Sequence, residues 1–137
     1  MLSTLSTVDY TDRFSVRTDA DRTPEQWARA IFGDVPNLGE LLIWRVLLGL
    51  RLSRGRSADT IAGWRVDARG DDWVRLEAAS RVMTANLVVR AAGGGVSLST
   101  FVRYDRPAAR LLWTPLSAVH RRLAPEALRS GVARLSR

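Results

Sequence analysis

Hydrophobic and polar residues alternate along several segments of the chain, and this period of two predicts half-buried strands. The first such segment covers residues 10–17. Tyr10, Phe14 and Val16 fall on one of its faces, whereas threonine, arginine and serine residues fall on the other. The alternation indicates a sheet with one buried and one solvated face. Further strands are predicted over residues 61–66, 73–82, 85–91 and 96–104.

Turn signals separate these segments. The sequence Arg-Gly-Asp-Asp at residues 69–72 predicts a turn, and the three glycines at 93–95 predict a hairpin before the last strand. The alternation also shifts phase once in the middle of the sheet region. A hairpin near Met83-Thr84 is expected to accommodate that shift.

Two short helices are predicted after the first strand. Thr23 is a suitable N-cap, Pro24 suits the first helical position, and Gln26 can complete a capping box. This helix is expected to end near Gly33. A second helix is predicted over residues 36–50, and it is apolar nearly all round. Such a helix is either buried or bound to a partner.

A long terminal helix is predicted to begin at Pro107. Pro115 and Pro125 are expected to kink or restart it, because proline has no N–H to donate to the helix. Apolar residues at helical spacing predict its buried stripe, with Leu123 and Leu128 as core positions. The stripe consists of Leu116, Val119, Leu123, Ala127, Leu128, Val132 and Leu135.

The order of these elements predicts an α+β fold. A strand, two short helices, at least four antiparallel strands and a long helix give an antiparallel sheet wrapped around the C-terminal helix. At 137 residues, the chain is expected to form one domain over residues 1–137, with residues 1–8 as a loose N-terminus.

Composition narrows the function classes. The net charge is +7, and all 21 basic residues are arginines. These arginines are dispersed and often alternate with apolar residues, so we expect no nucleic acid partner. The chain has no cysteine, which excludes disulfides and cysteine-based metal sites. No signal peptide is recognised, and the most apolar stretch, residues 38–52, is too short to span a bilayer. We therefore expect a cytoplasmic protein without membrane insertion.

Three segments near the C-terminus carry a resemblance to a known superfamily. They are Ser97–Arg103, Ala109–Trp113 and Val119–Arg121. With the element order, they resemble the START-like helix-grip superfamily, which includes polyketide cyclases and lipid-transfer domains. More narrowly, they look like an uncharacterised bacterial family whose end has the form T-x-V, G-R-x-Y/W, P-x-x-H-R. This chain departs from that form at Ala109, which replaces the glycine, and at Ser117-Ala118, which separate Pro115 from His120.

The resemblance implies a helix-grip fold, in which a curved sheet grips the terminal helix with an apolar cavity between them. Members of the narrower family occur alone or fused to NAD(P)-binding reductase domains. The superfamily supports carriers, sensors and enzymes on one scaffold, so the resemblance implies no particular reaction.

Several residues are candidates for the site. The only histidine, His120, lies at the edge of the apolar stripe and is either an acid–base residue or a structural histidine. Thr100 and Tyr104 share a strand face with Leu98, and small residues recur at Ala78 and Ser80. The predicted ligand-binding set is Ala78, Ser80, Leu87, Leu98, Thr100, Tyr104, Trp113 and His120.

Three functions remain open at this stage. The first is the binding of a small hydrophobic ligand in a central cavity. The second is a cyclase- or hydrolase-like enzyme that uses His120 with a hydroxyl such as that of Thr100 or Tyr104. The third is an interaction module that forms a homodimer or docks on a reductase. We expect no metal and no cofactor, because one histidine and scattered carboxylates offer no ligand set.

Overall fold

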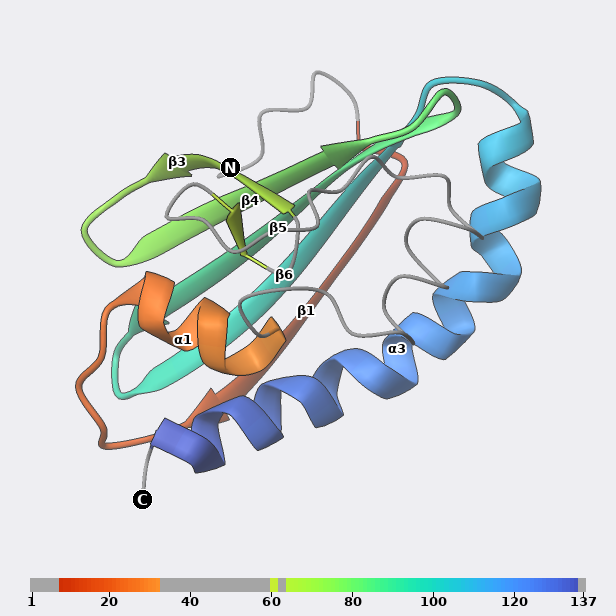
Figure 1. Ribbon diagram of the computed structural model, residues 1–137. Coiled ribbons are helices and arrows are strands. Elements are labelled where there is room, and N and C mark those ends of the chain that lie inside the picture. Colours follow the sequence, from red (N-terminus) through yellow and green to blue (C-terminus); the bar gives the residue numbers. More distant parts are fainter. Residues whose placement is uncertain (1–7, 33–59, 62–63, 136–137) are drawn as a thin grey trace.

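The computed structural model describes residues 8–32, 60–61 and 64–135. They form a six-stranded antiparallel sheet in the order β1-β6-β5-β4-β3-β2. Two helices, α1 (Pro24–Phe32) and α3 (Ala108–Leu135), lie on one side of it (Figure 1). The strands are β1 (Tyr10–Arg17), β2 (Thr60–Ile61), β3 (Trp64–Arg69), β4 (Trp73–Ala79), β5 (Met83–Ala92) and β6 (Gly95–Tyr104).

The alternating segments form strands as predicted. β1 has the expected bounds, and half-buried and exposed residues alternate along its whole length. β6 begins directly after Gly93 and Gly94, whose φ angles of 61° and 75° suit glycine in a tight hairpin. The sheet face that carries Leu76, Leu87 and Leu98 is covered by the two helices, and we call it the inner face. The opposite, outer face is rich in arginine.

Two strand boundaries differ from the prediction. Residues 61–66 are divided between β2 and β3. The hairpin expected at Met83-Thr84 lies earlier, because both of these residues belong to β5. The turn is made by Ser80–Val82, and the Ser80 Oγ accepts hydrogen bonds from the backbone N–H groups of Val82 and Met83 at 3.2 and 3.1 Å. This side-chain turn chemistry is a weaker sequence signal than a glycine.

Helix α1 starts with the predicted capping box. The Thr23 N–H donates to Gln26 Oε1 at 2.9 Å, and the Gln26 N–H donates to Thr23 Oγ1 at 3.1 Å. The helix buries Trp27, Ala28 and Ile31 against α3 and the inner face of β4 and β5. The predicted second helix, residues 36–50, lies outside the described residues, as do residues 1–7.

Helix α3 follows Pro107 as predicted, but its buried face was predicted wrongly in part. Leu128 and Val132 are buried, whereas Val119 and Leu123 are 43% and 47% exposed. The buried face instead combines Trp113 with small residues, which allow the helix to approach its neighbours closely. The complete buried set is Ala109, Trp113, Ser117, Ala124, Leu128, Gly131 and Val132.

The two helices and the sheet form an α+β helix-grip architecture, as the sequence predicted. Figure 1 shows α3 running beside β1 and α1, and changing direction along its length, as expected with Pro115 and Pro125 in its interior. The core lies between the inner face and the two helices. None of the helices in the described ranges has the length and apolar character needed to span a membrane.

Candidate functional site

A polar cluster lies on the otherwise apolar inner face, where β1 and β6 meet α3. Asp12 and Thr100 are direct partners across the β1–β6 pair. Both approach the same ring nitrogen of His120 from α3. Asp12 Oδ2 is 3.1 Å from His120 Nε2, and Thr100 Oγ1 is also 3.1 Å from it. One imidazole of α3 thereby contacts both the preceding strand β6 and the first strand β1, which is far away along the chain.

Tyr10 and Trp113 complete the surroundings of this histidine. The Tyr10 hydroxyl donates to Asp12 Oδ2 at 2.6 Å. The Tyr10 and Trp113 rings pack edge to face with centroids 5.2 Å apart, and the Trp113 and His120 centroids are 5.5 Å apart. We call Tyr10, Asp12, Thr100 and His120 the polar cluster, with Trp113 as its aromatic neighbour.

The electrostatics of the cluster favour an ionised Asp12. Burial alone would raise the pKa of Asp12, but hydrogen bonds from His120 and Tyr10 outweigh it, so the pKa lies below its ordinary value of 3.8. The pKa of Tyr10 rises to about 12, because burial and the hydrogen bond to Asp12 both favour the neutral phenol. Tyr10 is therefore a permanent donor near neutral pH.

The contacts of His120 indicate which nitrogen carries its proton. An ionised carboxylate can only accept, so its hydrogen bond favours the tautomer with the proton on Nε2. The Nδ1 lone pair is then an acceptor on the other side of the ring. The side chain is 20% exposed, against 10% for Asp12. The arrangement orients the ring, so that in this tautomer Nδ1 can accept a hydrogen bond.

Two buried polar atoms beside the cluster have no partner among the described residues. They are Asp12 Oδ1, the second oxygen of the carboxylate, and the indole nitrogen Nε1 of Trp113. Trp113 is only 4% exposed. Nearly all buried donors and acceptors in proteins have a hydrogen-bond partner, so two atoms without one need an explanation. One is an acceptor and the other is a donor.

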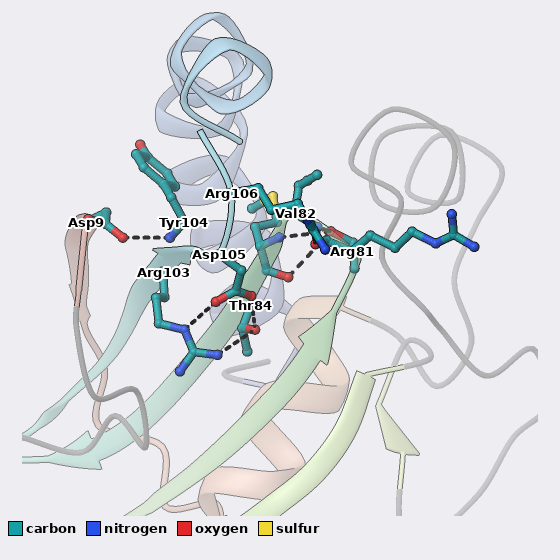
Figure 2. Close-up of polar contacts among 10 residues, drawn as sticks. Asp9, Arg81, Val82, Thr84, Arg103, Tyr104, Asp105 and Arg106 are labelled. Carbon is teal, nitrogen blue, oxygen red and sulfur yellow. Dashed lines mark hydrogen bonds and ion pairs between the residues drawn. The ribbon is translucent and has the colours of Figure 1, made fainter. Parts of the chain in front are cut away.

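The junction of β6 and α3 fixes where α3 begins (Figure 2). Asp105 accepts from Arg103 Nε at 2.6 Å and from Thr84 Oγ1 at 2.8 Å. Burial raises the pKa of Asp105, but the hydrogen bonds from Arg103 and Thr84 lower it by more. The net pKa of Asp105 is therefore below its ordinary value. The backbone N–H groups of Asp105 and Arg106 both donate to the Val82 carbonyl, at 2.8 and 3.2 Å. The β4–β5 turn is thereby tied to the start of the helix.

Cross-strand rows on the inner face lead from an apolar region to the cluster. One row runs Leu76, Leu87, Thr100, Asp12 across β4, β5, β6 and β1. The adjacent row runs Ala78, Ala85, Val102, Tyr10 across the same strands. The polar cluster is therefore continuous with a surface of leucine and small side chains.

The eight predicted site residues separate into two groups in the structure. Thr100, Trp113 and His120 come together at the cluster, and Leu87 and Leu98 lie beside Thr100 on the inner face. Ala78 is on the same face, in the neighbouring row. Two residues lie apart from His120. Ser80 belongs to the β4–β5 turn, and the Tyr104 ring lies 5.7 Å from the Arg110 guanidinium near the start of α3.

Sequence reasoning missed Asp12 and Tyr10 as site residues. Asp12 occupies the inward phase of β1, between Tyr10 and Phe14. A carboxylate at an inward position of an alternating strand was therefore the available signal. Its partner His120 is more than a hundred positions away along the chain. The pairing of β1 with β6 and the phase of α3 together bring the two side chains into contact.

Two hollows lined by described residues lie away from this cluster. One, of about 660 Å³, lies between the β1–α1 connection and the β5–β6 hairpin, and includes Asp19, Arg22 and Asp71. The other, of about 370 Å³, lies on the outer face. None of the eight predicted ligand-binding residues lines either hollow. In the described part of the chain, no group of three His, Cys, Asp or Glu side chains is placed to hold a metal ion.

Comparisons with known proteins give only distant similarity. No protein-family model and no curated protein matches the chain. Protein CV1439 from Chromobacterium violaceum has a TM-score of 0.47 at 14% identity, covering 93% of this chain and 99% of that one. Hypothetical protein jhp0584 from Helicobacter pylori has a TM-score of 0.47 at 11% identity over the whole of both chains. Ara h 8.0201 has a TM-score of 0.42 at 13% identity, covering 91% and 98%.

These TM-scores are all below 0.5. The fold assignment therefore rests on the strand order and helix placement of this chain itself, and the function has to be argued from its own residues.

Proposed function

We propose that the protein binds a small, mostly apolar molecule between the inner face of the sheet and α3. The polar end of that molecule lies against Asp12, Trp113 and His120. The observation that carries the proposal is the unpaired donor and acceptor beside the cluster, Trp113 Nε1 and Asp12 Oδ1. A ligand group that accepts from the indole and donates to the carboxylate satisfies both.

The two unpaired atoms make an occupied site energetically more favourable than an empty one. Leaving a buried donor or acceptor unpaired costs about 1–3 kcal/mol for each group. A chain that keeps two of them beside a partly exposed histidine loses that stability in every free molecule. Pairing them on binding returns it as affinity, and it also gives selectivity for ligands with a matching polar group.

The apolar body of the ligand is supported by the neighbouring rows of the sheet. Ala78 and Ala85 are directly opposite each other on β4 and β5. Small side chains at adjacent inner positions leave less bulk on the sheet than leucine or phenylalanine would. Burial of apolar ligand surface there is worth about 25 cal/mol per Å².

Ala78→Phe tests the apolar part of the proposal. An environment-sensitive fluorescent dye is expected to bind the parent protein saturably, and Ala78→Phe is expected to abolish that binding by filling the space. Ala133→Phe makes the same change at an exposed position of α3 and is expected to leave binding unchanged. Circular dichroism checks that both variants fold.

The dye experiment has a clear contrary outcome. If Ala78→Phe folds and binds the dye as well as Ala133→Phe does, the inner face does not contact the ligand. If Ala78→Phe does not fold, Trp113→Phe gives a second test, because it keeps an aromatic ring but removes the unpaired N–H together with the five-membered ring of the indole. Native mass spectrometry of freshly purified protein adds a direct search for a retained molecule.

A second function, proton transfer by His120, is favoured by one specific observation. Asp12 Oδ2 lies 3.1 Å from His120 Nε2, which orients the ring and leaves Nδ1 as the base. An enzyme of the cyclase or hydrolase type would use that nitrogen to remove a proton from the bound molecule. The binding proposal does not depend on this step.

The single histidine makes the tautomer directly measurable. ¹⁵N spectra of labelled protein are expected to show the proton on Nε2 in the parent. Asp12→Asn removes the acidic acceptor and is expected to shift the tautomer population. A parent protein with the proton mainly on Nδ1 rules out the proposed base.

A further inference from the structure

The arginines of the outer sheet face divide into two classes. Those on β3 to β6 each have a carboxylate partner. Arg75 pairs with Asp67 at 2.7 Å, and Arg103 pairs with Asp105 at 2.6 Å. Arg65 pairs with Asp67 and Glu77, and Arg90 pairs with Asp72.

The two outer-face arginines of β1 differ from all of these. Arg13 and Arg17 are exposed, and neither forms an ion pair with any described residue. Among the described residues of this face, only the arginines of the edge strand β1 therefore have no carboxylate partner. Both unbalanced arginines line the same groove.

This groove has a volume of about 370 Å³ and lies at the hairpin end of β1, β6 and β5. Ser15, Ser97 and Arg90 are direct cross-strand neighbours in its floor. Arg13 and Arg17 flank Ser15 two residues away on each side, which places them about 7 Å from it along the strand. None of the described residues that line the groove is acidic.

We propose that this outer-face groove is a binding site for a phosphate monoester. The proposal is independent of the ligand site on the inner face, which lies on the opposite side of the sheet. Arg90 is paired with Asp72, so Arg13 and Arg17 give the groove two positive charges that no described carboxylate pairs with. A monoester dianion matches both charges, whereas a carboxylate matches only one.

The donors of the groove also suit a phosphoryl group. A guanidinium presents paired N–H donors that fit phosphate oxygens bidentately, and serine hydroxyls can donate to the remaining oxygen. The groove is open to solvent, so its affinity should fall with added salt. The monoester can come from a soluble metabolite or from a lipid headgroup, and both sources present the same group.

Titrations with glycerol 3-phosphate at low ionic strength test the proposal. Backbone amide signals of Ser15, Ser97 and Gly94 are expected to shift saturably in NMR spectra, with weaker and non-saturating shifts from acetate. Arg13→Ala or Arg17→Ala is expected to raise the dissociation constant about tenfold, as expected for one lost charge-assisted hydrogen bond. Arg122→Ala removes an equal charge from the exposed side of α3 and is expected to change nothing.

The other outcomes decide against the site or identify the source. If the parent shows no saturable shift, or if Arg122→Ala weakens binding as much as Arg13→Ala, the groove is not a phosphate site. Sedimentation with vesicles containing phosphatidic acid, compared with phosphatidylcholine alone, then distinguishes the two sources. Arg13-dependent sedimentation identifies a lipid headgroup, and its absence with glycerol 3-phosphate binding intact identifies a soluble monoester.

Discussion

The two halves of α3 contact the rest of the molecule in opposite ways. The C-terminal half packs against α1 through Leu128, Gly131 and Val132, which are buried. At Gly131 the approach is so close that an added Cβ would lie 2.7 Å from the Ile31 Cα. The N-terminal half meets β1 and β6 through Trp113 and His120, and the buried atoms there include unpaired polar ones.

This difference separates stability from recognition within one helix. Close apolar packing at one end holds α3 on the sheet. Because that end supplies the stability, the other end can keep Asp12 Oδ1 and Trp113 Nε1 unpaired at a cost of a few kcal/mol. Substitutions in the C-terminal half should therefore change stability first, and substitutions at the cluster should change binding and pH dependence first.

The largest expected effect is that of Leu128→Ala. Leu128 is fully buried, with 0% exposure, so the truncation is expected to cost about 2–5 kcal/mol in the free energy of unfolding. Leu123→Ala is the matched control, because the same change at a 47% exposed position should stay within about 0.5 kcal/mol. Equal shifts in denaturant midpoint for the two variants would contradict the packing of α3.

Gly131→Ala tests the close approach of the two helices. Alanine is favoured over glycine in a helix interior by about 1 kcal/mol, so propensity alone predicts stabilisation. The added Cβ would meet the Ile31 backbone, and we expect overpacking to cost about 1–3 kcal/mol. Thermal or chemical melts should therefore show that Gly131→Ala is less stable than the parent protein. A more stable variant would show that the interface between α1 and α3 can accommodate the added methyl group.

The polar cluster predicts a smaller, pH-dependent effect. The pKa of Tyr10 rises from 10.0 unfolded to about 12 folded, so its contribution is complete below pH 10 and is lost as the pH rises toward 12. Tyr10→Phe should flatten the alkaline loss of stability in that window. The pKa of Asp12 is lowered, so its contribution is present above about pH 3.8 and is lost as the pH falls through the folded value.

Asp12→Asn should correspondingly reduce the loss of stability at acid pH. Denaturant melts across the pH range measure the free energy of unfolding at both the acid and the alkaline ends. Asp105→Asn is a control at a second carboxyl with a lowered pKa, on the outer face. Asp105→Asn should reduce only the loss of stability at acid pH. If it also changed the loss of stability at alkaline pH, that loss could not be assigned to Tyr10.

Elements that are encoded by patterns among neighbouring residues were predictable from the sequence. β1 and β6 follow from a period of two, and the start of α1 follows from a capping box over four residues. The buried face of α3 was predicted correctly at Leu128 and Val132 but wrongly at Val119 and Leu123, because the prediction followed the larger apolar residues. Besides Trp113, Leu128 and Val132, the helix buries alanine, serine and glycine, since close approach to α1 and the sheet requires small side chains.

The candidate site was predictable only in part for the same reason. His120, Thr100 and Trp113 were recognised by residue type and position on a face. Asp12 was not, because its role depends on the pairing of β1 with β6 and on the rotation of a helix far along the chain. Unpaired buried atoms have no sequence signature, since they are defined by their neighbours in space.

The central claim is that Trp113 and Asp12 receive the polar end of an otherwise apolar ligand. The most direct measurement compares 2-naphthol with naphthalene, which share a ring system and differ by one hydroxyl. The indole N–H signal of Trp113, assigned through Trp113→Phe, is followed in ¹H–¹⁵N spectra during each titration. We predict a downfield shift of this signal with 2-naphthol and a much smaller shift with naphthalene. We also predict that the parent protein binds 2-naphthol more tightly than naphthalene, and that Trp113→Phe abolishes this difference in affinity. Equal binding of both compounds with no shift of the Trp113 indole signal would contradict the account.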